Sequence, residues 1–96
     1  MELYQAEWCP HSHKVRQRLT ELGLEFVAKQ VPAEPDERAE MRARTGTIEI
    51  PVLIGADGAV FRGEDEILEH LEGFEERRDA ERHREKSREE VKEFTA

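Results

Sequence analysis

The first third of the chain changes from a strand pattern to a helix pattern and back, and this order restricts the fold more than any other feature. Residues 2–6 predict a short strand, and residues 10–22 place apolar side chains at helical spacing until Gly23 supplies a stop. Residues 25–31 are rich in β-forming side chains, and Pro32 ends that run. Two strands joined through one helix pair in parallel by a right-handed crossover, which predicts an α/β fold.

The second half of the domain adds a hairpin between two further helices. The charged segment 35–45 predicts a weakly amphipathic helix. Strand patterns at 51–54 and 59–61 are separated only by residues 55–58, and a link this short joins two strands as an antiparallel hairpin. Residues 64–74 then predict a helix with one apolar face.

The last part of the chain, residues 75–96, differs in kind. It holds few apolar side chains, and opposite charges recur three positions apart, as between Glu75 and Arg78. Because it lacks Gly and Pro and is rich in helix formers, we expect a charged helical extension, with a disordered tail as the alternative. The predicted organisation is therefore one domain at 1–74 followed by an extension at 75–96.

The lone cysteine, Cys9, lies between the first strand and the first helix. Unpaired backbone N–H groups and the positive end of the helix dipole favour thiolate over thiol at that point. Pro10 supports this placement, because its fixed φ suits the first helical position. We therefore interpret Cys9 as a nucleophile; the alternative is a small buried hydrophobic side chain.

A second feature is Pro51, which opens the strand that should lie beside the first one. If the Ile50–Pro51 bond is cis, the backbone N–H and C=O of Ile50 are left unpaired and face the Cys9 loop, where they can pair with an extended peptide. That arrangement gives a peptide-binding edge beside a nucleophile. The alternative is an ordinary strand-opening proline.

Four motifs follow one another along the chain. They are Cys-Pro-x-Ser at 9–12, Thr-Gly-x-x-x-Ile-Pro at 45–51, the hairpin, and Gly-acid-acid at 63–65. In this order they resemble the thioredoxin superfold, and within it the glutaredoxins and the N-terminal domain of glutathione transferases, over roughly residues 2–74. The resemblance implies a thioredoxin-like βαβαββα fold with a central four-stranded mixed sheet, followed by the charged C-terminal helical extension.

The resemblance also implies a glutathione site. In these families the proline matching Pro51 is cis, and the residue matching Ile50 binds the cysteine portion of glutathione through its backbone. A helix start that carries acidic side chains holds the carboxylate and the amine of the γ-glutamyl group. The implied catalytic residues are Cys9, Pro10 and Ser12, and the implied glutathione-binding residues are Ile50, Pro51, Glu64, Asp65 and Arg38, with Arg42 as the alternative to Arg38.

Two positions depart from the family's pattern. Ser12 stands in place of the second active-site cysteine, so only a monothiol cycle remains. Residues 5–7 supply no lysine before the active-site turn, and the Glu7 carboxylate tends to raise the pKa of Cys9 and to repel anionic glutathione. We nevertheless expect the pKa of Cys9 to lie below that of a free thiol, because the helix N-terminus should outweigh a solvated carboxylate.

The implied function is that of a monothiol-disulfide oxidoreductase in which Cys9 attacks mixed disulfides of glutathione or a related low-molecular thiol. Glutathione is then a co-substrate, and glutathionylated proteins are the partners. We expect no tightly bound cofactor and no metal. We expect the protein to be a monomer or a weak dimer. One alternative is a glutathione-dependent iron–sulfur cluster carrier that uses Cys9 from two chains. Another is a non-catalytic thioredoxin-fold interaction domain.

Composition and charge argue against several other classes of protein. The formal net charge of -8 argues against binding to nucleic acid, whose phosphates demand a basic face. No segment approaches the roughly 20 apolar residues of a membrane span, and the first residues lack a signal-peptide pattern. The single cysteine excludes an intramolecular disulfide, and we expect a reducing, cytoplasmic setting.

Overall fold

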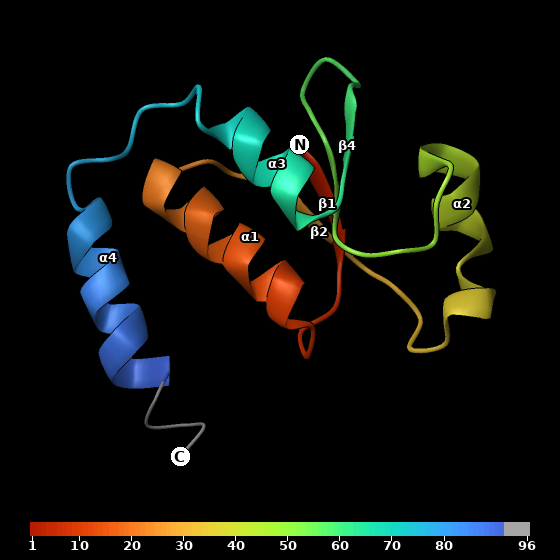
Figure 1. The fold of residues 1–96 in the computed structure, drawn as a ribbon, viewed down its shortest axis with the longest axis horizontal. Coiled ribbons are helices and arrows are strands. Elements are labelled where there is room, and N and C mark those ends of the chain that lie inside the picture. The colour runs from red at the N-terminus through yellow and green to blue at the C-terminus, as the bar shows by residue number, and fades with distance from the viewer. Residues whose placement is uncertain (92–96) are drawn as a thin grey trace.

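The computed structural model describes residues 1–91 and is organised around a four-stranded sheet (Figure 1). The strands lie in the order β2-β1-β3-β4, with β1 parallel to β2 and antiparallel to β3, and β3 antiparallel to β4. The predicted fold class, a four-stranded mixed sheet in a βαβαββα chain, is confirmed. The strands are β1 (Glu2–Gln5), β2 (Val27–Gln30), β3 (Val52–Ile54) and β4 (Val60–Arg62).

Helices cover both faces of this sheet. Figure 1 shows α1 and α3 together on one side and α2 on the other, with α4 beyond α1. The helices are α1 (Pro10–Leu22), α2 (Ala39–Thr45), α3 (Glu64–Leu71) and α4 (Ala80–Lys86), with a 3-10 turn at Pro35–Glu37 and a π-helical turn at Ser87–Val91. None of the helices in this part of the chain combines the length and the apolar character that crossing a membrane requires.

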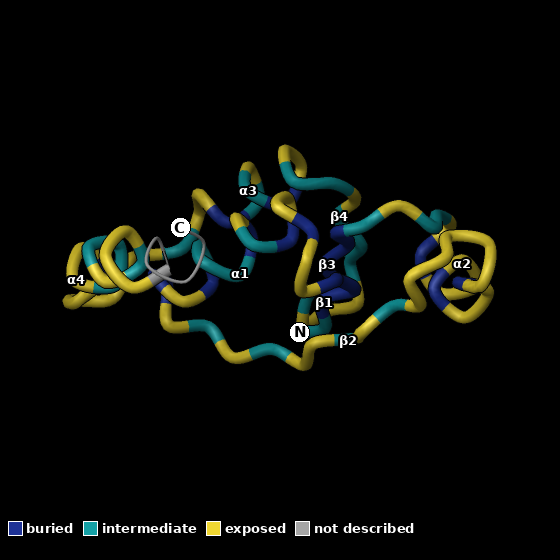
Figure 2. The backbone as a smooth tube through the Cα atoms, turned by 90° about the horizontal axis from the view of Figure 1, so that it is seen from below, coloured by how far each residue is buried: buried dark blue, intermediate teal, exposed yellow. Residues whose placement is uncertain are grey.

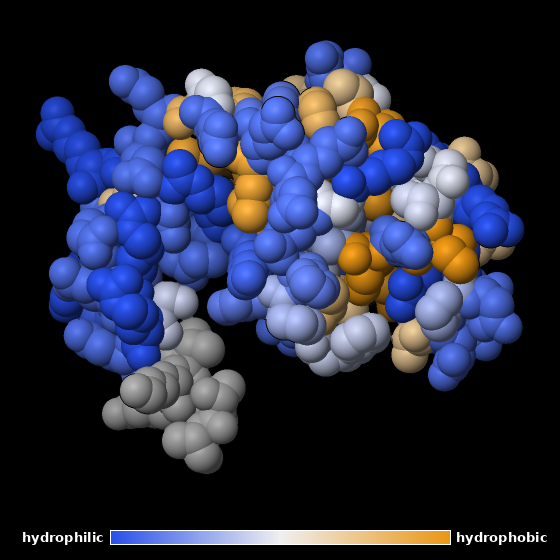
Figure 3. Space-filling view, viewed as in Figure 1, coloured by the Kyte–Doolittle hydropathy of each residue, from blue (hydrophilic) through white to orange (hydrophobic). Residues whose placement is uncertain are grey.

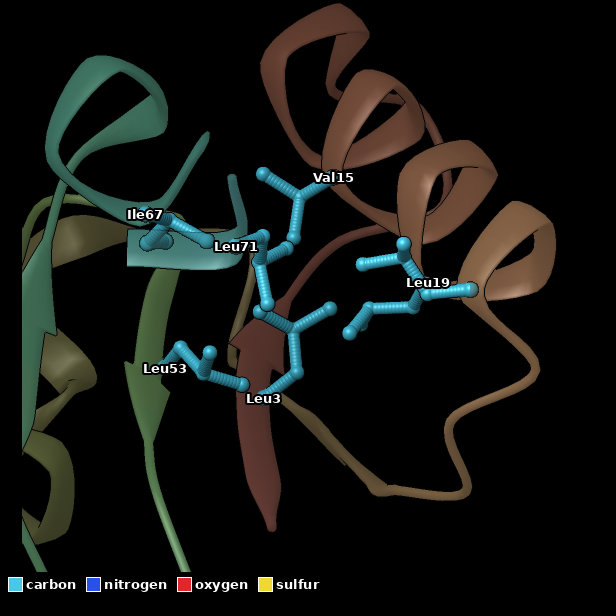
Figure 4. Close-up of a cluster of buried hydrophobic side chains, with 7 residues drawn as sticks. Leu3, Val15, Leu19, Leu53, Ile67 and Leu71 are labelled. Carbon is cyan, nitrogen blue, oxygen red and sulfur yellow. The ribbon is translucent and has the colours of Figure 1, made fainter. Parts of the chain in front are cut away.

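Two apolar clusters hold the layers together, one on each face of the sheet. Successive side chains of a strand point to opposite faces, so Leu3 enters one cluster and its neighbour Tyr4 the other. Figure 4 shows the side chains of β1 and β3 meeting those of α1 and α3. The larger cluster contains Leu3, Val15, Leu19, Leu22, Leu53, Ile67 and Leu71, and the smaller one contains Tyr4, Met41 and Val52.

Helix α1 begins and ends where the sequence predicts. Cys9 is its N-cap with extended backbone angles, and Pro10 occupies the first turn. Gly23 ends the helix with φ 65°, a left-handed conformation that glycine adopts without a steric penalty. The nucleophile candidate therefore lies at the first turn of a long, well-capped helix.

The predicted single helix at 35–45 is wrong at Arg38, which separates the 3-10 turn from α2. Its guanidinium is buried and donates hydrogen bonds to the carbonyl oxygens of Pro32 (2.9 Å), Ala33 (3.2 Å) and Ile48 (2.9 Å). These three acceptors on two loops stabilise the break, because a buried guanidinium needs hydrogen-bond partners. Arg38 thus ties the segment before α2 to the segment before β3.

The extension is helical where it is described, and α4 lies against α1 rather than apart from the domain (Figures 1 and 2). Ala80 is buried at this contact, and the backbone N–H of Arg77 donates to the carbonyl of Glu21 at 3.0 Å. Arg84 reaches the Glu21 carboxylate at 2.7 Å. The outer surface of α4 is predominantly hydrophilic (Figure 3), and residues 92–96 of the predicted extension lie outside the described residues.

Candidate active site

Cys9 occupies a sheltered position at the N-terminus of α1. Only 6% of the residue is exposed, and its N–H donates to the carbonyl of Ala6 at 3.2 Å. The N–H of His13 donates to the Cys9 carbonyl at 3.0 Å and closes the first helical turn. Ser12 is fully buried one turn along, where its hydroxyl accepts a hydrogen bond from the N–H of Ala6 at 3.4 Å.

This surrounding favours the thiolate. Burial alone would raise the pKa of the Cys9 thiol, but hydrogen bonds from the Ser12 hydroxyl and from the N–H groups of Ser12 and His11, together with the charge of Arg16, hold that pKa below its ordinary value. The direction is the one expected for a cysteine at a helix start. Among the two readings of Cys9, a reactive thiol fits its surroundings better than an inert apolar side chain.

The Ile50–Pro51 peptide bond is cis, as the motif at 45–51 predicts. Val52 pairs with Tyr4 in the sheet, so the two residues before Val52 lie at the end of β1, where the loop to Cys9 begins. Within residues 1–91, neither the N–H nor the C=O of Ile50 has a hydrogen-bond partner. An unpaired backbone edge therefore lies at the same end of the sheet as Cys9.

The N-terminus of α3 joins this end of the sheet through Pro51, whose carbonyl accepts a hydrogen bond from the N–H of Gly63 at 2.9 Å. The Glu64 carboxylate approaches Nδ1 of His11 at 2.8 Å and Nζ of Lys14 at 3.8 Å, which connects the first turns of α3 and α1. Asp65 is exposed, and within the described part of the chain its carboxylate has no ion-pair partner. The two predicted acids therefore differ, since Glu64 is engaged and Asp65 is accessible.

The predicted partner of a glycyl carboxylate, Arg38, is directed elsewhere, because its guanidinium serves the three carbonyl groups described above. Arg42, the alternative, is exposed on α2. It lines a hollow of about 250 Å³ together with Pro35, Asp36, Arg38, Ala39 and Ile48. Of the two arginines, Arg42 is the exposed one, whereas the guanidinium of Arg38 is buried and engaged with the loops.

Two residues near Cys9 were not predicted from the sequence. His11 contacts Glu64 across two helices, and no sequence spacing relates residues 53 positions apart. Arg16 lies one turn beyond Ser12, and its Nη2 approaches the Glu7 carboxylate at 3.2 Å. A basic residue seven positions after the cysteine was the available signal for Arg16, because two helical turns return to the same face.

The order of elements, the cis proline and a cysteine at the start of α1 define a thioredoxin-fold protein with a candidate active-site thiol. The chain belongs to the glutaredoxin family, whose model, described as Glutaredoxin, matches residues 1–60. No curated protein matches the sequence.

Solved structures with a similar fold include bacterial proteins described as glutathione S-transferases or as containing a glutathione S-transferase domain. A glutathione S-transferase domain-containing protein of Marinobacter aquaeolei VT8 is 28% identical with a TM-score of 0.66 over 78% of this chain and 39% of its own. A glutathione S-transferase of Rhodospirillum rubrum F11 is 34% identical with a TM-score of 0.64 over 75% of this chain and 32% of its own. A possible glutathione S-transferase of Rhodopseudomonas palustris is 26% identical with a TM-score of 0.63 over 73% of this chain and 37% of its own. The chain therefore spans less than two fifths of these proteins.

Proposed function

We propose that this protein is a monothiol-disulfide oxidoreductase that removes glutathione, or a related low-molecular thiol, from mixed disulfides on other proteins. The observation that carries the proposal is the environment of Cys9. Its thiol lies at a helix N-terminus beside the Ser12 hydroxyl, and its pKa is lowered. Membership of the glutaredoxin family supports it. The single cysteine also fits a reducing, cytoplasmic setting.

The reaction consists of two thiol–disulfide exchanges. In the first, the Cys9 thiolate attacks the glutathionyl sulfur, the protein–glutathione disulfide breaks, and the released protein thiolate takes up a proton from solvent. In the second, the thiolate of another glutathione attacks the glutathionyl sulfur on Cys9, which yields oxidised glutathione and restores the Cys9 thiolate. Overall, one glutathione thiol is consumed for each protein thiol released, and the disulfide bond passes from the protein–glutathione pair to oxidised glutathione, so no other reductant is needed. Hydrogen bonds from Ser12 stabilise Cys9 both as attacking and as leaving thiolate.

The remaining residues bind the glutathionyl group in this proposal. The N–H and C=O of Ile50 pair with its cysteinyl backbone, and the N-terminal N–H groups of α3 attract its γ-glutamyl carboxylate. Asp65 is the accessible acid for the γ-glutamyl ammonium group, while Glu64 holds α3 against α1. Arg42 takes the role of glycyl-carboxylate partner that the sequence first suggested for Arg38.

The test uses the purified chain and a glutathionylated peptide, with glutathione supplied and the formation of oxidised glutathione followed. We expect turnover with the wild-type protein and none above the uncatalysed rate with Cys9→Ser. With the peptide but without added glutathione, the mass of the wild-type protein should increase by one glutathionyl group. Full activity of Cys9→Ser, or a wild-type thiol that alkylates no faster than free cysteine at neutral pH, would contradict the assignment.

A further inference from the structure

A network of hydrogen bonds runs from the edge strand β2 to the Cys9 turn. Gln5 is 1% exposed, and in the parallel register of β1 and β2 it lies opposite Gln30. Its Nε2 donates to Oε1 of Gln30 at 2.8 Å, and its own Oε1 accepts a hydrogen bond from Nη1 of Arg16. A buried amide costs free energy unless it is hydrogen-bonded, so this pair satisfies Gln5 and at the same time holds the Arg16 guanidinium in place.

Ala6 connects the guanidinium to the nucleophile. Nη1 of Arg16 approaches the Ala6 carbonyl at 3.4 Å, and the same carbonyl accepts the N–H of Cys9 at 3.2 Å. The N–H of Ala6 donates to the Ser12 hydroxyl, which in turn hydrogen-bonds the Cys9 thiolate. The N–H and the C=O of Ala6 are therefore both engaged in holding the active-site turn.

Arg16 and Glu7, two oppositely charged side chains at this turn, differ in how strongly solvent screens them. The Arg16 side chain is 19% exposed, whereas the side chain of its partner Glu7 is 86% exposed. Water screens an exposed charge more strongly than a largely buried one. The positive charge of Arg16 therefore outweighs the negative charge of Glu7 at the Cys9 sulfur. The other charged or titratable groups at this end are His11, His13 and Lys14 on α1 and Glu64 and Asp65 on α3. Among them, His11 and Lys14 both pair with Glu64.

We propose that Arg16, held by the Gln5–Gln30 pair, is a positioning residue that fixes the Ala6–Cys9 turn and supplies the positive charge that the sequence lacks before Cys9. The effect of Arg16 on the pKa of Cys9 does not depend on the proposed function. Only its consequence for catalysis rests on that function. Glu7 has the opposite effect on the thiol, and that effect is weak because its carboxylate is solvated.

The experiment compares Arg16→Gln with the matched control Arg18→Gln. Both substitutions remove one positive charge from α1, but the Arg18 guanidinium contacts Glu21 (2.8 Å) and Glu76 (2.6 Å) at the far end of the helix. The rate of Cys9 alkylation by iodoacetamide is measured against pH, without glutathione or substrate. We expect Arg16→Gln to move the midpoint to higher pH and to slow alkylation at neutral pH by about two- to fivefold, and Arg18→Gln to leave the midpoint unchanged.

Two results would overturn the proposal: a midpoint in Arg16→Gln equal to that of the wild type, or an equal shift in Arg18→Gln, which would make the effect one of net charge. If Arg16→Gln does not fold, Arg16→Met carries the test, because it also removes the charge and the fork that joins Gln5, Ala6 and Glu7 but keeps an apolar stem of similar length. A midpoint shifted to higher pH supports the proposal, and an unchanged midpoint overturns it. Because alkylation needs no glutathione, a protein with a shifted midpoint and no deglutathionylation refutes the proposed function alone.

Discussion

At the scale of single residues, the lowered pKa of Cys9 depends on hydrogen bonds that outweigh burial. A thiolate in a site with 6% of the residue exposed loses most of its hydration, yet the pKa is lowered because Ser12 and two backbone N–H groups take the place of water. Serine in place of a second cysteine thus has a chemical consequence of its own. It removes a resolving thiol and adds a hydrogen-bond donor.

Ser12→Ala should raise the pKa of Cys9 and slow deglutathionylation by about two- to tenfold, the equivalent of one hydrogen bond. The loss is modest because the N–H groups of the first turn remain. Alkylation against pH and turnover with a glutathionylated peptide measure the two effects. A variant with a wild-type alkylation profile would show that the hydroxyl does not act on the thiolate.

Glu7→Lys should lower the pKa of Cys9 further and speed deglutathionylation, because it exchanges a solvated negative charge beside Arg16 for a positive one. The matched control is Glu25→Lys, which makes the same charge change at an exposed position. Glu25 precedes β2, and because β2 runs parallel to β1 it lies at the end of the sheet opposite the Cys9 turn. Alkylation at several pH values compares the two. An equal effect of both substitutions would mean that overall charge, and not the neighbourhood of Cys9, is responsible.

At the scale of elements, ion pairs attach α4 to α1. Arg84 contacts Glu21 (2.7 Å) and Glu76 (3.0 Å), and Arg18 contacts the same two carboxylates from α1. Glu21 is buried, and its hydrogen bonds to Arg18, Gln17 and Arg84 overcome the effect of that burial and lower its pKa. A cross-linked set of this kind holds two helices in register more effectively than isolated surface pairs do.

Acid should weaken this attachment. Hydrogen bonds from Arg84 and Arg18 lower the pKa of Glu76 from 4.5 to about 2, so its contribution to stability is complete above pH 4.5 and is lost as the pH falls through about 2. Thermal unfolding of the wild type and of Glu76→Gln, followed between neutral and acid pH, tests this. The difference in melting temperature should be largest near neutrality and should shrink in acid; a constant difference would contradict the sign of the effect.

At the scale of the whole molecule, both apolar clusters lie within residues 1–74, and the contacts of α4 add one buried alanine and the ion pairs. The chain matches only the part of the transferase structures that this domain covers, 32% to 39% of their length. In this protein α4 occupies a face of α1 that the domain alone would leave exposed.

Deletion of residues 75–96 should therefore leave a domain that unfolds cooperatively, but at a lower temperature than the full chain. The reason is that the clusters remain complete, while Glu21 loses Arg84 and Arg18 loses Glu76 as ion-pair partners. Calorimetry of the truncated and full chains measures the difference. Loss of a cooperative transition would show that α4 belongs to the domain itself.

Features that depend on neighbours along the chain were determined by the sequence. The bounds of α1 follow from Pro10 at its start and Gly23 at its end, and the hairpin of β3 and β4 follows from the short link between them, residues 55–59. In each case the interacting groups lie within a few positions of one another, so local sterics and backbone hydrogen bonding suffice. The cis bond before Pro51 was predicted through the family motif, and a proline alone left it open.

Partners of long charged side chains were decided only by the tertiary structure. Arg38 was predicted to bind glutathione, but its guanidinium donates to carbonyl groups that the fold brings within reach. Arg16 contacts Gln5, Ala6 and Glu7 only because the end of β1 lies against α1. The pairing of α4 with Glu21 has the same origin. Arginine side chains have many rotamers and several donors, and which acceptor they bind depends on which unsatisfied oxygen is nearest after the helices and strands have packed.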